Sequence, residues 1–163
     1  MIIRPIEPSD WPFFWPMLES VFRLGDTYAF SPNISEGEAY RVWVEEPHET
    51  YVALEEGDDR ILGTYYIKPN QPTLGAHVCN CGYVVATTAR GRGIATAMCI
   101  HSQQEAKQLG FIAMQFNLVV STNISAIRLW QKLGFEIIGT LPKAFRHSAV
   151  GFVDALVMYK TLQ

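Results

Sequence analysis

The most regular alternation of apolar and polar positions in this sequence lies between residues 112 and 120. Every second residue there is apolar, namely Ile112, Met114, Phe116, Leu118 and Val120. A period of two predicts a β-strand with one strongly apolar face. Asn117 shares the opposite face with Gln115, so two amide side chains are expected on that side of the strand.

The period of the pattern changes after this strand. Apolar residues then recur at helical spacing, at Ala126, Ile127, Trp130 and Leu133. Asn123 stands before them as a favourable N-cap residue, and Gly134 stands where many helices end in the left-handed conformation. A helix is therefore predicted between these two positions.

The same order of elements occurs earlier in the chain. The apolar, β-branched run 81–86 predicts a strand, and residues 96–109, which Gly110 follows, predict a helix. Strand, helix, strand, helix and strand thus follow one another between residues 79 and 139. That order predicts a right-handed crossover and a parallel strand pair in the middle of a sheet.

Weaker patterns complete the expected elements. Further strands are predicted over residues 2–6, 50–55, 60–68, 135–139 and 152–159, and further helices over 8–24 and 36–45. Pro16 is expected to kink or break the first of these helices, Ser35 to cap the second, and residues 142–151 to form a loop. The predicted fold class is α/β (α+β), in one domain over residues 1–163, with a mixed, mostly antiparallel sheet flanked by helices.

Composition narrows the classes of function. Hydrophobic residues make up 48% of the 163 residues and charged residues 18%, as in ordinary globular proteins. The net charge of −3 argues against a general nucleic-acid binder, because no basic face is available to neutralise phosphates. No apolar run approaches the ~18 residues that cross a membrane, and nothing at the N-terminus resembles a signal peptide. Three cysteines in such a chain favour reduced thiols, so a cytoplasmic location is expected.

A metal site is not expected. His77, Cys79 and Cys81 alternate along one predicted strand, but no further ligands stand elsewhere at a suitable spacing. Small residues that pack within a strand account for this pattern better than zinc does.

The stretch Arg90–Ala95, with glycines at positions 91 and 93, lies between a predicted strand and a predicted helix. Such a turn is a site for phosphate, because glycines let the backbone approach closely and the first N–H groups of a helix lack intrahelical partners. A Rossmann dinucleotide site is excluded: Thr96 stands where another glycine belongs, and residues 108–112 offer no acidic side chain for a ribose.

Two motifs resemble those of the GCN5-related N-acetyltransferases. The first is Arg90-x-x-Gly93-x-Ala95 after a strand, and the second is the run from Asn123 to Phe135, which is similar to the family's later CoA-binding helix. The resemblance implies the GNAT fold, with the parallel strand pair at the acetyl-CoA site. It also implies direct transfer of an acetyl group from the CoA thioester to an amine.

This resemblance assigns a set of acetyl-CoA contacts. The main chain of Val84 and Val85 is expected to bind the pantetheine arm like an added strand, and Asn123 to bond to the arm or to its adenine side. The pyrophosphate is expected to contact a continuous run, Arg90, Gly91, Arg92, Gly93, Ile94, Ala95 and Thr96. A tight turn without a ligand and a plain N-cap at Asn123 are the structural alternatives.

Trp130 departs from the family pattern. Many members carry a tyrosine at this position, which is thought to protonate the departing CoA thiolate. An indole N–H is no useful acid, so Trp130 is expected to pack beside the CoA arm. A second departure is that the central strands carry no carboxylate to act as a general base.

A closer resemblance, over residues 61–145, is to the fungal azetidine-2-carboxylate N-acetyltransferases, which acetylate cyclic imino acids. The stretches that carry it are 62–70, 80–83 and 116–123. It implies that Asn80 orients the substrate carboxylate or the developing oxyanion, that Asn117 holds a water that removes the proton, and that Tyr83 forms a wall for the substrate ring. Asparagines that pair with loop backbone at strand ends are the structural alternative.

The expected function is transfer of an acetyl group from acetyl-CoA to a small-molecule amine, with a cyclic imino acid or proline analogue as acceptor. Acetylation of a primary amine or peptide N-terminus, and a non-catalytic acyl-CoA-binding module, are the alternatives. A pocket closed by Tyr83 and residues 25–30 would favour a small imino acid, whereas a groove open at both ends would favour a peptide. No nucleic-acid or membrane partner is expected, and the closer relatives suggest a homodimer.

Overall fold

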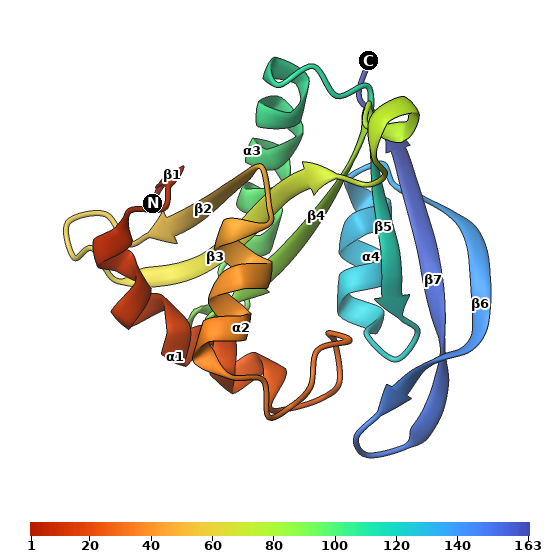
Figure 1. Ribbon diagram of the computed structural model, residues 1–163, viewed down its shortest axis with the longest axis horizontal. Coiled ribbons are helices and arrows are strands. Elements are labelled where there is room, and N and C mark those ends of the chain that lie inside the picture. Colours follow the sequence, from red (N-terminus) through yellow and green to blue (C-terminus); the bar gives the residue numbers. More distant parts are fainter.

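The computed structural model describes residues 1–163, and its centre is a seven-stranded sheet (Figure 1). The strands lie in the order β1-β2-β3-β4-β5-β7-β6. Their bounds are β1 (Ile2–Pro5), β2 (Glu49–Leu54), β3 (Ile61–Pro69), β4 (Val78–Val85), β5 (Ala113–Val120), β6 (Glu136–His147) and β7 (Gly151–Thr161). All neighbouring strands are antiparallel except β4 and β5. The predicted mixed, mostly antiparallel sheet with a parallel pair in its middle is confirmed.

Helices cover both faces of the sheet. Their bounds are α1 (Trp11–Phe22), α2 (Glu36–Tyr40) with its π-helical continuation η2 (Arg41–Glu45), α3 (Ile94–Gln108), α4 (Ile124–Lys132), and the 3₁₀ turns η1 (Pro8–Asp10), η3 (Thr73–Gly75) and η4 (Thr87–Ala89). The helices α1 and α2 cross one face, and α3 and α4 cross the other (Figure 1). None of them is both long enough and apolar enough to span a membrane.

An apolar core lies on each face of the sheet. Phe14 of α1 and Trp43 of η2 belong to one core, and Met98 of α3 belongs to the other. Side chains alternate along β4, so Val84 enters the first core and Cys81 the second. The two sides are called the α1 face and the α3 face below.

The predicted helix ends are confirmed where the sequence carries a local signal. Ser35 Oγ accepts a hydrogen bond from the N–H of Glu38 at 3.2 Å, as an N-cap residue does. Gly110 and Gly134 follow α3 and α4 with φ angles of +87° and +92°. These glycines adopt the left-handed conformation that other residues rarely take.

A kink or a break was predicted at Pro16, and the break is wrong. The helix α1 runs from Trp11 to Phe22 with Pro16 inside it. Pro16 lacks the N–H that would bond to the carbonyl of Pro12, which lies in the first turn. The helix therefore loses a bond near its end, where its stability depends least on the ladder.

The loop predicted for residues 142–151 is also wrong. The strand β6 continues through Pro142 to His147, and residues 148–150 form the turn to β7. Proline is tolerated because β6 is the edge strand of the sheet. The β6–β7 register shifts between Leu141 and Phe145. Within this shift Lys143 has a φ of +52°, and its N–H donates to Asp154 Oδ1 at 2.9 Å.

Candidate active site

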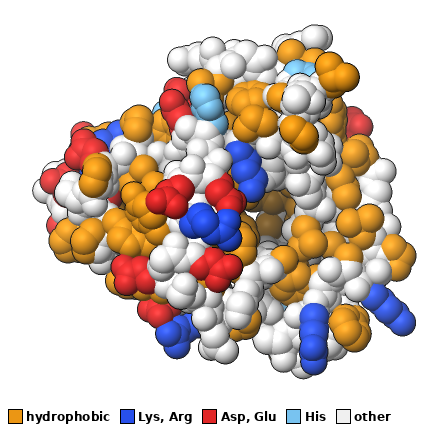
Figure 2. All heavy atoms as spheres, in the orientation of Figure 1, with side chains coloured by type: hydrophobic (Ala, Val, Ile, Leu, Met, Phe, Trp, Pro, Cys, Tyr) orange, Lys and Arg blue, Asp and Glu red, His pale blue; other side chains and the backbone are white.

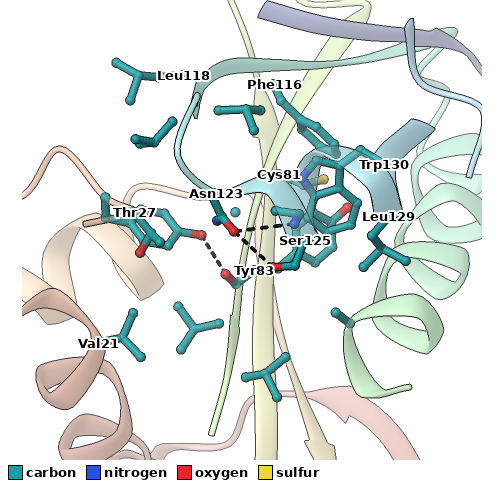
Figure 3. Close-up of a pocket in the computed structure, with 18 of the residues that line it drawn as sticks. Val21, Thr27, Cys81, Tyr83, Phe116, Leu118, Asn123, Ser125, Leu129 and Trp130 are labelled. Atoms are coloured by element: carbon teal, nitrogen blue, oxygen red, sulfur yellow. Dashed lines mark hydrogen bonds between the residues drawn. The ribbon is translucent and has the colours of Figure 1, made fainter. Parts of the chain in front are cut away.

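The sheet opens between β4 and β5. These parallel strands pair at two register positions, Val78 with Ala113 and Cys79 with Met114, and then diverge. A cavity of about 810 Å³ lies in the gap, lined by both strands, the loop after α1, the turn before α3 and the first residues of α4. Its mouth is the hollow near the centre of the face in Figure 2, and Figure 3 shows side chains around it.

Asn80 occupies the first position beyond the last β4–β5 pair. Its Nδ2 donates to the carbonyl of Gln115 on β5 at 2.9 Å, and its Oδ1 accepts from the hydroxyl of Tyr66 at 3.2 Å. The side chain is 7% exposed. Asn80 therefore replaces a main-chain donor of β4 at the point where the strands part. Its second Nδ2 hydrogen remains available to the cavity, which Asn80 lines.

Gly82 lets two tyrosines approach β4 on the α1 face. A Cβ at this position would lie 2.6 Å from Cε1 of Tyr66 and 3.0 Å from the hydroxyl oxygen of Tyr28. Contacts this short force a neighbour to move, and here the neighbours are aromatic side chains in a buried wall. The glycine therefore brings Tyr28 and Tyr66 together beside Asn80.

The main chain of β4 turns polar groups toward the gap at alternate residues. The N–H of Ala86 donates to the carbonyl of Leu62 on β3 at 2.9 Å. Antiparallel alternation then directs the groups of Val84 toward β3 and those of Val85 toward the gap. Of the two valines expected to bind the pantetheine arm through their main chain, Val85 has its groups free, while β3 occupies those of Val84.

The turn before α3 forms the opposite end of the cavity. Gly91 and Gly93 have φ angles of +74° and +78°, and a Cβ at either position would meet open space. Gly93 is the N-cap of α3, no side chain caps this end, and the first main-chain bond of the helix runs from Ala97 to Gly93. The N–H groups of the first turn are thus free for an anion, which fits the pyrophosphate of acetyl-CoA.

The structure separates the two arginines of this turn. Arg90 lines the cavity, together with Gly91, Gly93 and the following two residues. Arg92 instead donates to both carboxylate oxygens of Glu55, at 2.8 and 3.0 Å. The expected charge of Arg92 on the pyrophosphate is therefore engaged elsewhere. Thr96, the last residue of the expected run, does not line the cavity.

Asn123 begins α4 at the cavity wall. Its Oδ1 accepts from the N–H of Ala126 at 3.4 Å and from the hydroxyl of Ser125 at 3.3 Å, while its Nδ2 has no acceptor within the protein (Figure 3). The N-cap prediction is confirmed. The free Nδ2 leaves a donor beside the gap for a second role.

Aromatic rings form the α3 side of the cavity. The Trp130 ring centroid lies 5.0 Å from that of Tyr83 and 5.2 Å from that of Phe116. The hydroxyl of Tyr83 lies 2.7 Å from Ser102 Oγ, and burial raises the pKa of this phenol well above its usual value. Tyr83 thus lines the cavity beside Trp130, on the opposite face of β4 from Asn80. The two expected substrate contacts do not share a face.

Asn117 lies on the same face as Asn80, on the neighbouring strand. Its Oδ1 accepts from Gln115 Nε2 at 2.9 Å, and its Nδ2 donates to Asn70 Oδ1 at 2.6 Å. Asn117 is exposed and lines the cavity with Asn70 and Asn80. Amide side chains from β4, β5 and the loop after β3 therefore converge on one part of the cavity.

The loop after α1 closes the α1 side of the cavity. Its Tyr28 hydroxyl donates to the carbonyl of Tyr83 at 2.8 Å. At the start of the loop, Ser148 of the β6–β7 turn donates from its N–H to the carbonyl of Gly25 at 3.0 Å and from its Oγ to that of Leu24 at 2.6 Å. The loop is thus bonded to β4 at one end and to the β6–β7 turn at the other.

Few charged side chains line the cavity. Asp26 is the acidic one, Lys68 and Arg90 are the basic ones, and no histidine is among them. Burial raises the pKa of the Cys81 thiol well above its usual value, so this thiol stays protonated. His101 lies outside the cavity with its Nδ1 2.6 Å from the hydroxyl of Tyr65, and burial lowers its pKa.

Asp26, Lys68 and Tyr66 line the cavity but were not predicted as site residues from the sequence. None of them belongs to a motif, although residues 25–30 were expected to help close the pocket. Lys68 ends an apolar strand pattern, which was the one available signal. The role of Lys68 depends on which residues lie opposite it in the cavity, and the sequence pattern does not show them.

The site thus combines a split between two parallel strands with an uncapped helix start at one end, which suits a ligand that carries a pyrophosphate on an extended arm. The chain matches the model of the acetyltransferase (GNAT) family over residues 11–135. It therefore belongs to the GNAT family.

Relatives and solved structures agree with this assignment. The chain is 40% identical over 98 residues to the N-acetyltransferase aca1 of Schizosaccharomyces pombe, a match that covers 60% of this chain and 47% of that protein. It is 40% identical to a GCN5-related N-acetyltransferase from Kribbella flavida, with a TM-score of 0.92 over 98% of this chain and 96% of that chain. The chain spans less than half the length of the curated relatives it matches.

The fold is also shared with a GNAT phosphinothricin acetyltransferase from Sinorhizobium meliloti, solved in complex with acetyl-CoA. The two chains are 20% identical, with a TM-score of 0.86 over 98% of this chain and 87% of that chain. At this identity the likeness concerns the fold.

Proposed function

We propose that this domain transfers an acetyl group from acetyl-CoA to the amine of a small molecule, and that the acceptor is a cyclic imino acid or proline analogue. The observation that carries the proposal is the cavity between β4 and β5, which joins a free helix start to a cluster of amide side chains. Bound acetyl-CoA supplies an acetyl group that is already activated as a thioester.

Different residues along the cavity bind different parts of acetyl-CoA. The N–H groups at the start of α3 and the Arg90 side chain bind the pyrophosphate, Val85 bonds the pantetheine arm through its main chain, and Asn123 donates to it through Nδ2. Trp130 packs beside the arm. These contacts place the reacting thioester at the Asn80 end of the gap.

Asn80 and Asn117 act at the reacting end. The free Nδ2 hydrogen of Asn80 stabilises the oxygen that gains charge as the amine attacks, and one such donor typically contributes about 3 kcal/mol. Asn117 orients a water that accepts the proton lost by the amine. An amide cannot itself take this proton, and neither β4 nor β5 carries a carboxylate that could act as a general base, so the proton leaves through water. CoA departs as the thiolate, which the thiol pKa of about 8.5 permits.

The α1 side of the cavity, where we place the acceptor, is closed by the loop after α1, and this favours a small substrate. The bond from Tyr28 to Tyr83 and the bonds from Ser148 to the start of the loop bridge the α1 side of the cavity. An extended peptide running along a groove would have to displace these contacts. The end of a peptide and primary amines remain rival acceptors, and a non-catalytic acyl-CoA-binding module is the rival outside enzymes.

The test is CoA release, followed by thiol trapping, from purified protein with acetyl-CoA and a panel of amines. The panel contains azetidine-2-carboxylate, 4-hydroxyproline, several primary amino acids, polyamines and a short peptide. We expect turnover on the imino acids, and we expect kcat to fall about 100-fold in Asn117→Ala. Asn117 is exposed, so this variant should fold normally. Asn33→Ala, another exposed asparagine away from the cavity, is the matched control.

Each other result points to one of the rivals. Turnover on primary amines or the peptide alone would contradict the imino-acid acceptor. Binding of acetyl-CoA in calorimetry without turnover on any amine would favour the binding module.

A further inference from the structure

We propose that the acceptor is recognised as a zwitterion: Lys68 pairs with its carboxylate and Asp26 with its ammonium. The inference rests on the proposed function, because it concerns the acceptor of the same reaction. It assigns specificity to two residues that no motif singles out.

Lys68 lies at the acceptor end of the cavity. It is opposite Asn80 in the β3–β4 register, and alternation from Tyr66 puts it on the α1 face. Its Nζ lies 5.2 Å from the ring centroid of Tyr66, whose hydroxyl bonds to Asn80. The ammonium of Lys68 is thus placed over the tyrosine that contacts the reacting end.

Lys68 is too far from the phosphate turn to serve acetyl-CoA there. Asn80, its register partner, is five residues from the end of β4 at Val85, which corresponds to about 17 Å along a strand. The turn at Arg90 begins beyond that end. Arg90 therefore supplies the positive charge for the pyrophosphate, and Lys68 is free for a different anion.

Asp26 faces the cavity from the loop after α1. The loop is bonded on both sides of it, through the carbonyl of Gly25 and through the hydroxyl of Tyr28. These bonds hold Asp26 at the cavity wall, which it lines as its acidic residue. A half-buried carboxylate with no partner is unfavourable unless a cation binds to it.

Neither charge is neutralised within the protein. The ion pairs of the structure involve neither Lys68 nor Asp26, and no side-chain hydrogen bond is made by either. Other acids near arginines, such as Asp10 and Glu55, are paired. Arg90, the other unpaired cation of the cavity, lies at the helix start, so Lys68 and Asp26 are left to match an acceptor that carries both charges.

A simple amine fits this arrangement less well. Its ammonium would pair with Asp26 but would leave Lys68 unpaired, with a like charge in the same cavity. An amino or imino acid satisfies both groups, and its ammonium then gives a proton to the water held by Asn117 before the neutral nitrogen attacks the thioester. Pairing of the acceptor's carboxylate with Lys68 also orients the acceptor, so that its ring nitrogen faces the thioester.

The experiment compares azetidine-2-carboxylate with azetidine-2-carboxamide, which has the same ring amine without the acid. The variants are Lys68→Met, Lys68→Arg and Asp26→Asn, with Lys107→Met on the exposed end of α3 as the matched control. The readouts are kcat and KM for each acceptor from CoA release, together with KM for acetyl-CoA.

We expect wild-type protein to prefer the acid. Lys68→Met should raise KM for the acid about 10- to 100-fold, leave the amide nearly unchanged and leave KM for acetyl-CoA unchanged. Lys68→Arg should restore most of the preference, because it keeps the charge. Asp26→Asn should raise KM for both acceptors, since both carry the ammonium. Equal effects of Lys68→Met on acid and amide, or no preference in wild type, would overturn the inference.

A binding measurement distinguishes a failure of the proposed function from a failure of the zwitterion site. If wild-type protein releases no CoA with any amine, calorimetry with CoA present measures how tightly the acid and the amide bind. Tighter binding of the acid that Lys68→Met abolishes would uphold the zwitterion site without catalysis. Equal binding of acid and amide would overturn the inference as well.

Discussion

Asn80 Nδ2 lies 2.9 Å from the carbonyl oxygen of Gln115, at the position where β4 and β5 stop pairing. A side chain here does what the next main-chain N–H of β4 would do in a continuous parallel sheet. The strands can therefore separate without leaving this carbonyl unpaired. The opening that forms the cavity begins at this contact.

Replacement of Asn80 by Asp should destabilise the protein. The carboxylate cannot donate to Gln115, and it would place negative charge against a carbonyl oxygen. We expect the free energy of unfolding to fall by about 2–3 kcal/mol in urea titrations. Asn33→Asp, at an exposed site, should change it by less than about 0.5 kcal/mol. A loss of kcat with unchanged stability would instead assign Asn80 to the chemistry alone.

Gly82→Ala should disturb the tyrosine wall. The added Cβ would lie 2.6 Å from the ring of Tyr66 and 3.0 Å from the Tyr28 hydroxyl, so both side chains must move. We expect a loss of about 1–3 kcal/mol in unfolding free energy and a higher KM for the acceptor. Gly139→Ala is the matched control, because a Cβ at that strand position meets nothing within 4 Å. Equal stabilities for the two variants would contradict the packing argument.

Ser148→Ala should loosen the acceptor side of the cavity. It removes the Oγ bond to the carbonyl of Leu24 while leaving the main-chain bond to Gly25 in place. We expect KM for the acceptor to rise about three- to tenfold, since one neutral hydrogen bond contributes about 1 kcal/mol, with KM for acetyl-CoA unchanged. Ser20→Ala, which removes a comparable bond to the carbonyl of Met17 within α1, controls for the loss of a hydroxyl. An effect confined to acetyl-CoA would show that the contact serves the other end of the cavity.

Asp10→Asn should reveal a pH-dependent contribution to stability. Hydrogen bonds from Arg4 at 2.8 and 2.9 Å lower the pKa of Asp10 below its usual value, against the opposing effect of burial. A lowered folded-state pKa stabilises the protein above the unfolded pKa of about 3.9, and this contribution is lost as pH falls through the folded value. In urea titrations, we expect the free energy of unfolding of wild type to exceed that of Asp10→Asn by about 1–2 kcal/mol at pH 7 and by less at pH 3. A difference that does not change with pH would contradict this assignment.

Features that depend on neighbouring residues were predictable from the sequence. The caps at Ser35 and Asn123 and the helix-ending glycines Gly110 and Gly134 follow from side chains or backbone freedom within a few residues. The crossover order predicted the parallel strand pair for a similar reason, because chain connectivity allows few alternatives. The two errors, the break at Pro16 and the loop over residues 142–151, both concern elements that continue through a proline. A helix start and an edge strand both tolerate it.

Side-chain roles within the site were predictable only in part. Period-two alternation put Asn117 on the less apolar face of its strand, and the structure shows Asn80 of β4 on the same side of the sheet, where both line the cavity. The same alternation put Tyr83 on the other face of β4, where Ser102 binds its hydroxyl. Arg92 had the right position for a phosphate contact, yet Glu55, which is distant in the chain, holds its guanidinium.

What the sequence by itself determined is the order of elements, their caps, the glycine-containing turn before α3 and the family. What only the tertiary structure decided is which groups remain free to bind a ligand. Asn80 meets Gln115, Arg92 meets Glu55 and Ser148 meets Leu24 across long stretches of chain. Hydrogen bonds and ion pairs of this kind depend on distances of a few ångströms between remote residues, and local sequence patterns do not encode those distances. Asp26 and Lys68 are without an ion pair for the same reason, since the fold brings no side chain of opposite charge to either.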